Sequence, residues 1–155
     1  MDSENQKEWI RLVSKPRRAL LIDDDSNDCD LIVRMSDPFN IIWEVVSNGT
    51  DAIKKIKDAE HYDLIFMDLQ LGAYPEGVDL FREIKTVCPK CPILVFAGYI
   101  TNNTIADVMR HGFAMFAQKP ESLDSNFFSQ LFLALNIPRK GPATKTKEQE
   151  MRQNV

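Results

Sequence analysis

Five short, almost wholly apolar runs alternate with amphipathic helical stretches along this chain, and few folds accommodate such an alternation. The runs predict β-strands near 19–23, 41–46, 63–68, 92–97 and 113–117. The stretches that follow them predict helices near 27–36, 49–58, 78–87, 103–111 and 123–136. Strands that are apolar on both faces need cover on both sides. We therefore expect an α/β fold with a doubly wound, five-stranded parallel sheet.

Single residues indicate how some of these elements begin, end and lie in the sheet. Glu44 interrupts the apolar pattern of the second run, which suits a strand at the edge of the sheet. The side-chain oxygen of Ser26 can accept the free amides of the first helix, and Asn48 or Thr50 can do so for the second. Gly112 can end the fourth helix in a left-handed conformation.

The last helical stretch carries large apolar side chains at fourfold spacing. We expect this stripe to face the core, with Phe128 and Phe132 beside it. The residues of the stripe are Leu123, Phe127, Leu131 and Leu135.

The chain is long enough for one compact domain and too short for two ordinary ones, at 155 residues. We expect the domain to cover 18–138, with a polar extension over 1–17 and a flexible tail over 139–155. This division leaves no room for a second effector domain. Any output is then expected to pass through contact with another protein or with a second copy of this chain.

Composition restricts the classes of function. A net charge of −4 and a pI near 5.2 argue against general nucleic-acid binding, which needs a basic face. No apolar run approaches the length of a membrane span and the polar start has no signal core, so we expect a soluble, cytoplasmic protein. Three cysteines without secretory context predict reduced thiols rather than a disulfide framework.

Charged residues follow three of the predicted strands. Asp23 and Asp24 follow the first, Asp68 follows the third and Lys119 follows the fifth. Parallel sheets bind ligands beyond the carboxyl ends of their strands, so we expect these side chains to meet there. Crowded carboxylates repel one another unless a cation joins them, and hard oxygen ligands without histidine or thiolate favour Mg²⁺.

With a divalent ion bound, Asp68 becomes a plausible nucleophile toward phosphorus. The ion and Lys119 would offset the repulsion between an anionic acceptor and an anionic donor. Such a transfer needs positioning and charge neutralisation more than acid–base help. The expected product is an aspartyl phosphate.

These residues resemble a known family, the receiver domains of two-component response regulators. The resemblance runs from about Arg18 to Asn136 and rests on Leu-Leu-Ile-Asp-Asp-Asp, Asp-Leu-Ile-Phe-Met-Asp-Leu-Gln and the Lys119-Pro120 pair. It implies the flavodoxin-like receiver fold, with five (βα) units and strand order 2-1-3-4-5. It also implies a phosphohistidine donor on a partner histidine kinase or histidine phosphotransfer protein.

The resemblance assigns roles to single residues. Asp68 would be the acceptor, Asp24 a direct ligand of Mg²⁺ and Asp23 a ligand through metal-bound water. Gln70 would lend its backbone carbonyl to the metal, and Lys119 would contact the phosphoryl group. Like other receivers, the chain would not be an enzyme in its own right.

The chain departs from the family where receivers carry Ser or Thr after the fourth strand, because Ala97 stands there. In the family, that hydroxyl binds the phosphoryl group and draws inward an aromatic residue of the fifth strand, here Phe116. The missing hydrogen bond is worth roughly 1.5–3 kcal/mol, so the response to phosphorylation would fall about 10- to 100-fold. Thr101 is a poor substitute, since it lies well into the following loop.

Two further departures concern the rim of the site. The loop after Asp68 lacks the Met-Pro that is usual in receivers and is one residue longer before Gly77. Tyr99 is large enough to shade the acceptor from water or a phosphodonor. Both are expected to reshape access to the pocket.

Two functions remain open at this stage. The first is a phosphorylatable, single-domain response regulator that signals to a downstream target, or to a second copy, through 103–111, 113–117 and 123–136. The second is a pseudo-receiver whose partner binding is constitutive, for which Ala97 is the reason. A weaker third is a haloacid-dehalogenase-like phosphatase that uses the Asp-x-Asp pair of Asp23 and Asp25.

Two features have simpler explanations. The run of aspartates before a helix can merely cap that helix and complement its dipole. Cys88-Pro-Lys-Cys91 has the spacing of a redox or metal pair, but it precedes a strand and no second pair or histidine accompanies it. We therefore assign the cysteine pair no function from the sequence.

Overall fold

Strands and helices alternate without exception in the computed structural model, which describes residues 17–59, 62–121 and 123–140. The strands are β1 (Arg17–Ile22), β2 (Ile41–Val46), β3 (Leu64–Met67), β4 (Ile93–Ala97) and β5 (Met115–Gln118). The helices are α2 (Ser26–Met35), α3 (Gly49–Asp58), α4 (Gly77–Val87), α5 (Asn102–Met109) and α6 (Ser125–Ala134). No helix within the described residues is long and apolar enough to cross a membrane. The predicted α/β class is confirmed.

All strand pairs in the sheet are parallel, and the order is β2-β1-β3-β4-β5. This confirms the predicted order 2-1-3-4-5. It also confirms the edge position of β2. Glu44 on β2 accepts hydrogen bonds from Arg18 at 3.0 Å and from the Tyr62 hydroxyl, so its charge is paired at the sheet edge.

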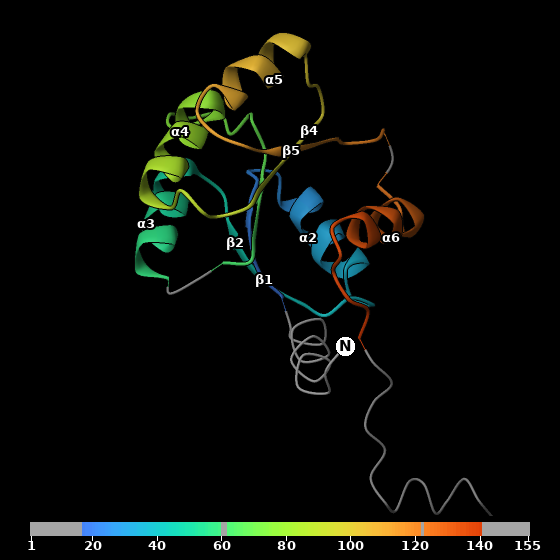
Figure 1. The fold of residues 1–155 in the computed structure, drawn as a ribbon. Helices are drawn as coiled ribbons and strands as arrows, with labels where there is room; N and C mark the ends of the chain where they lie inside the picture. The colour runs from blue at the N-terminus through green and yellow to red at the C-terminus, as the bar shows by residue number, and fades with distance from the viewer. Residues whose placement is uncertain (1–16, 60–61, 122, 141–155) are drawn as a thin grey trace, which may run out of the picture.

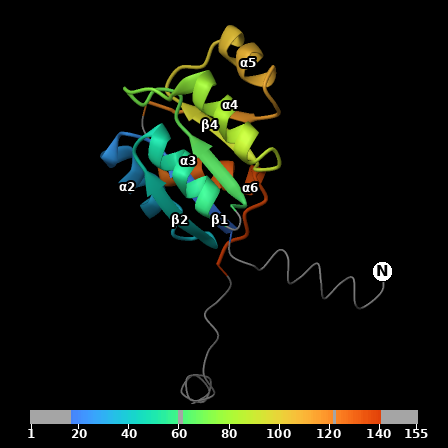
Figure 2. The same ribbon diagram turned by 90° about the vertical axis from the view of Figure 1, so that its left-hand side faces the viewer.

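The helices cover the sheet on both faces (Figure 1). Helices α3, α4 and α5 lie on one face, and α2 and α6 lie on the other. Figure 2 shows α3 and α4 in front of the strands and α6 behind them. Side chains alternate along β1, so Leu20 and Ile22 point into the apolar core under α3, α4 and α5. Ala19 and Leu21 point into the apolar core under α2 and α6. The central strands are thus buried on both sides, as their apolar sequences predict.

The helix ends agree only in part with the prediction. Asp25, not Ser26, caps α2, because its carboxylate accepts from the amides of Asn27 and Asp28 at 2.9 and 3.1 Å, and Ser26 is already the first helical residue. Asn48 caps α3 as predicted. Helix α5 ends at Met109, three residues before the glycine expected to end it.

The buried face of α6 is displaced from the predicted stripe. Phe128 and Phe132 are fully buried, with ring centroids 6.2 Å from those of Phe96 and Phe66 respectively. These contacts form because α6 packs over strands whose own phenylalanines project toward it. The stripe residues pack around this pair and are only partly buried: Leu123, Phe127, Leu131 and Leu135.

The described body extends slightly beyond the predicted domain. Arg17 already belongs to β1, and Arg139 and Lys140 return to the turn after α2, where Lys140 N donates to the Pro38 carbonyl at 2.9 Å. The rest of the predicted extension and tail, 1–16 and 141–155, lies outside the described residues.

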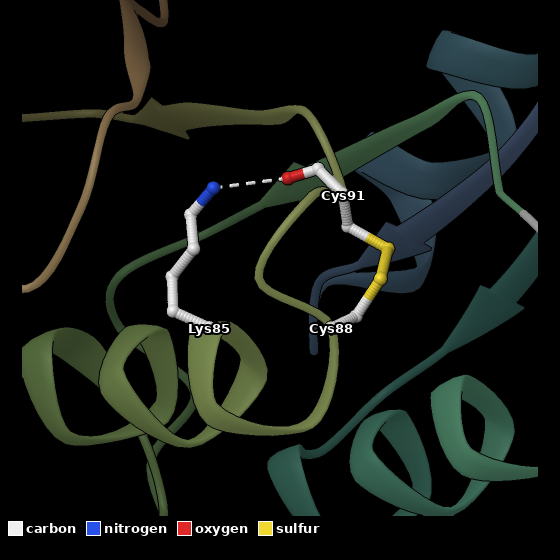
Figure 3. The surroundings of a disulfide bond; sticks show 3 residues. All are labelled: Lys85, Cys88 and Cys91. Atoms are coloured by element: carbon white, nitrogen blue, oxygen red, sulfur yellow. Dashed lines mark hydrogen bonds between the residues drawn. A yellow bond between two sulfur atoms is a disulfide. The ribbon is translucent and has the colours of Figure 1, made fainter.

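One prediction about the cysteines is wrong. Cys88 and Cys91 form a disulfide (Figure 3). Cys29 is a free, buried thiol. The pair forms because α4 ends at Val87 and the chain turns back at once, with Cys91 N donating to the Cys88 carbonyl at 3.2 Å. This turn brings the two α-carbons to 5.5 Å, a separation that a disulfide spans.

Candidate functional site

The predicted site residues meet at the carboxyl edge of the sheet. Ladder hydrogen bonds continue one residue past three strands and hold these positions. Asp68 N donates to the Ile22 carbonyl at 2.9 Å, and Lys119 N donates to the Ala97 carbonyl at 2.8 Å. Asp23 N donates to the carbonyl of Val46, the last residue of β2, at 3.1 Å. The sheet itself therefore aims these side chains at one another.

Lys119 is the centre of the cluster. Its ammonium donates to Asp23 at 2.7 Å, to Asp68 at 2.9 Å and to Asp28 at 3.1 Å. The side chains of Lys119, Asp23 and Asp68 are only 11%, 1% and 12% exposed. The ammonium therefore interacts with these carboxylates with little screening by water.

Burial and pairing act in opposite directions on the pKa values. Burial by itself lowers the pKa of Lys119, but the hydrogen bonds to Asp23 and Asp68 outweigh it and hold that pKa above the usual value. Burial raises the pKa of Asp23, against the lowering effect of the Lys119 ammonium and the Asp25 amide. The ammonium stays charged and compensates a carboxylate that is poorly solvated.

Three carboxylates of the cluster are close enough to share a metal ion. Asp23, Asp24 and Asp68 each offer an oxygen, and these atoms lie within 4.8 Å of one another. The backbone amide of Asp25 donates to Asp23 Oδ1 and that of Gln70 donates to Asp68 Oδ1, both at 3.0 Å. These hydrogen bonds orient the two carboxylates. All the donors are hard oxygens, a set that fits a small divalent cation such as Mg²⁺.

A model of the response regulator receiver domain matches residues 19–126. The chain belongs to this family. Among curated proteins, the receiver is 26% identical over 105 residues to the transcriptional regulatory protein ZraR of Klebsiella oxytoca, a match covering 68% of this chain and 23% of that protein. It is 37% identical over 68 residues to ComA of Bacillus subtilis, covering 44% of this chain and 32% of that protein. The chain thus spans about a quarter to a third of the length of these relatives.

Solved structures share the fold of this chain. A CheY-like receiver domain protein from Methanospirillum hungatei JF-1 superposes with a TM-score of 0.66 at 18% identity, covering 89% of this chain and 99% of that one. The receiver domain of the sensor histidine kinase PA1611 from Pseudomonas aeruginosa PAO1 gives 0.65 at 19% identity, covering 78% and 98%. That structure has a magnesium ion coordinated in its active site cleft. The receiver fold is a signalling domain of two-component systems.

The position of the missing hydroxyl is closed to solvent in this receiver. Ala97 ends β4 with its side chain buried in the same apolar cluster against which the half-buried Phe116 packs. Thr101 does not supply the hydroxyl, because its oxygen caps α5 and is bonded to the amide and hydroxyl of Thr104 at 3.1 and 2.9 Å. Tyr99 is 75% exposed, so it is not packed over the acceptor.

The loop after β3 is held against the start of α3. The Glu76 carboxylate accepts from the amides of Leu71 and Gly72 at 2.6 and 2.9 Å. Gly49 approaches so closely that a Cβ there would lie 2.1 Å from the Pro75 carbonyl oxygen, which only glycine permits. This loop therefore forms a structured rim beside the acidic pocket.

The sequence reasoning missed Asp28. This carboxylate lies in the first turn of α2 and is the third partner of Lys119, at 3.1 Å. It also lines an open hollow of about 470 Å³ beside Lys119, with Gly98 and Glu121. The sequence could have indicated Asp28, because it lies in the first turn of the helix that follows Asp23, and that turn begins at the same edge of the sheet.

Proposed function

We propose that this receiver accepts a phosphoryl group on Asp68 from a phosphohistidine of a partner histidine kinase or phosphotransfer protein. The Lys119 ammonium is the observation that carries the proposal. It is held 2.9 Å from Asp68 and 2.7 Å from Asp23, in a pocket where the carboxylates would otherwise repel an anionic donor. Such an arrangement stabilises the negative charge of the Asp68 carboxylate.

Each residue has a separate task in this proposal. An Asp68 oxygen forms the new bond to phosphorus while the bond to the donor imidazole breaks, and Lys119 pairs with the incoming phosphoryl oxygens. Asp23, Asp24, Asp68 and the Gln70 carbonyl would hold Mg²⁺, as the cleft of the PA1611 receiver holds magnesium. When bound, the ion supplies further positive charge against the repulsion between acceptor and donor.

The output surface that we propose lies on α5, β5 and α6. Met109 and Phe113 at one end of it, and Leu133 on α6, expose large apolar side chains to solvent. Exposed apolar groups on a receiver face suit contact with a downstream protein. A second copy of the chain is the other partner that this surface could take.

The test is a titration of the full chain with Mg²⁺ and acetyl phosphate, followed by intact mass and by amide chemical shifts with beryllofluoride. We expect one phosphoryl adduct that Asp68→Asn abolishes and that the exposed control Asp58→Asn retains. Asp24→Asn should weaken the Mg²⁺ dependence of labelling. No adduct on the wild-type chain would refute the proposal, and unchanged labelling of Asp68→Asn would show that the acceptor is misassigned.

A second function, constitutive binding as a pseudo-receiver, is favoured by the environment of Ala97. Phe116 is already half-buried against the apolar cluster that includes Ala97, so its position does not depend on a hydroxyl there. In that case beryllofluoride would shift amides only within the pocket, and the α5–β5–α6 surface would bind its target equally well before and after addition.

The phosphatase alternative has less support. Its Asp-x-Asp pair would need Asp23 as nucleophile and Asp25 as general acid. Asp23 is buried against Lys119, and the Asp25 carboxylate caps α2. Both side chains already have structural partners, so neither is set up for those roles.

A further inference from the structure

The Cys88–Cys91 disulfide lies at the opposite edge of the sheet from the acidic pocket. Cys88 is the C-cap of α4, and its amide donates to the Ile84 carbonyl at 2.7 Å. The following turn delivers the chain to Pro92, whose carbonyl accepts from Ile65 N at 2.9 Å and so joins the turn to β3. The disulfide therefore closes the connection between α4 and β4, remote from the phosphoryl-acceptor chemistry.

The two sulfur-bearing residues differ in their access to solvent. Cys91 is 4% exposed and belongs to the apolar core, whereas Cys88 is only partly buried and packs at the margin of that core. An external thiolate can therefore approach Cys88 more readily than Cys91, and Cys91 becomes the leaving sulfur. Cys29 offers a contrast, since burial raises the pKa of its thiol to about 12 and keeps it protonated.

Lys85 connects this turn to the far end of α5. Its ammonium donates to the Cys91 carbonyl at 3.0 Å (Figure 3). Its methylene groups lie against Gly112, where a Cβ would come within 3.2 Å of them. Gly112 has a φ of +152° and directly precedes the exposed Phe113. The Cys91 carbonyl and the α5–β5 turn thus share one side chain.

We propose that Cys88 and Cys91 form a reversible thiol–disulfide exchange site for a dithiol reductant, and that Lys85 transmits its state to the α5–β5 turn. A thiolate of the reductant attacks the Cys88 sulfur, the bond between the two protein sulfurs breaks, and Cys91 leaves as a thiolate that takes up a proton. The second thiolate of the reductant then closes its own disulfide and releases Cys88. Two electrons and two protons pass from the dithiol to the protein, and a disulfide oxidant reverses the reaction.

Reduction removes the cross-link but leaves the core contacts of Cys91 in place. A disulfide closing a loop of four residues restricts the unfolded chain only modestly, so reduction should lower the folding equilibrium constant by about 20-fold. A change of this size leaves a stable domain folded. The reduced turn is then free to shift the Cys91 carbonyl and, through Lys85, the backbone at Gly112.

The test is a redox titration of the full chain with reduced and oxidised dithiothreitol. Samples are quenched in acid, denatured and labelled with a maleimide, and the labels are counted by mass. We expect one label on the oxidised chain and three on the reduced chain, with the same midpoint from both directions. A pair that excess reductant cannot open in the folded protein, or that oxidised dithiothreitol cannot close, would overturn the exchange site.

Matched variants separate the two parts of the proposal. Cys29→Ser should keep the transition with one label fewer in each state, whereas Cys91→Ser, or the less buried Cys88→Ser, should abolish it. On reduction, amide shifts should change at Gly112 and Phe113 in the wild type and not in Lys85→Met. Shifts confined to the turn in the wild type would refute transmission through Lys85, and so would a change at Gly112 in Lys85→Met as large as that in the wild type.

Discussion

Lys119→Met is the substitution that most directly tests the electrostatics of the pocket. Methionine keeps most of the length of the side chain and removes the ammonium. Asp23, whose side chain is 1% exposed, would then lose the cation 2.7 Å from its carboxylate. Removing one partner of a buried pair costs about 3–5 kcal/mol, because the remaining charge stays desolvated. Asp68, 12% exposed, loses the same cation and shares in this cost, whereas Asp28, 28% exposed, adds less.

The expected loss is measurable by urea unfolding. With a denaturant slope of about 2 kcal/mol/M, a loss of about 4 kcal/mol moves the midpoint down by about 2 M. Mg²⁺ should raise the midpoint of Lys119→Met by more than it raises that of the wild type, since the ion would provide the missing positive charge. The slope itself should not change, because the substitution leaves the fold intact.

Two controls make this prediction refutable. Lys140→Met removes an ion pair whose side chains are 55% and 83% exposed, so its unfolding midpoint should stay near that of the wild type. The double variant Asp23→Asn with Lys119→Met should recover the part of the lost stability that comes from Asp23, because neither charge of that pair remains. If Lys119→Met alone lost less than about 1 kcal/mol, the claim that Lys119 compensates a desolvated Asp23 would be refuted.

Three further predictions concern other residues. Ala97→Ser should increase the beryllofluoride-induced amide shift at Phe116, reflecting a switch equilibrium displaced by about 10- to 100-fold, and an unchanged shift would count against the hydroxyl as the missing coupling. Asp28→Asn should speed phosphorylation by acetyl phosphate by up to about fivefold, since one partly exposed negative charge leaves the pocket, and slower labelling would contradict this. Burial and the hydrogen bond to Glu44 raise the pKa of Tyr62 from 10.0 to about 12, so the unfolded chain releases this proton at a lower pH than the folded chain does. The contribution of Tyr62 to the free energy of unfolding is therefore fully present below pH 10 and is lost as the pH rises toward 12. Tyrosinate absorbance and urea midpoints across this range check it, and Glu44→Gln should lower the pKa of Tyr62.

The fold was predictable because its main determinant is local in the sequence. Strands such as Leu64–Met67 are apolar at every position, which requires cover on both faces, and helical stretches separate all of them. The finer details were less predictable. Asp25 caps α2 in place of Ser26, because its carboxylate accepts hydrogen bonds from the amides of Asn27 and Asp28. The sequence does not specify which of the two adjacent residues makes these bonds. The buried face of α6 depends on where Phe66 and Phe96 project from the sheet.

The candidate site divides in the same way. Asp23, Asp68 and Lys119 could be brought together from the sequence, because residues that follow parallel strands share one edge of the sheet. Asp28 was missed because its meeting with Lys119 depends on the direction of the first turn of α2. Likewise, the carboxylates within 4.8 Å of one another define a metal-binding geometry that spacing alone only suggests.

The sequence by itself determined the doubly wound parallel sheet and the three charged strand ends, since both follow from periodicity along the chain. It also showed that Ala97 lacks the hydroxyl that receivers use. Only the tertiary structure decided that Lys119 pairs with three carboxylates, that Cys88 and Cys91 are joined, and that Lys85 spans from their turn to Gly112. These contacts join residues by distance and direction in space, which a one-dimensional pattern does not specify.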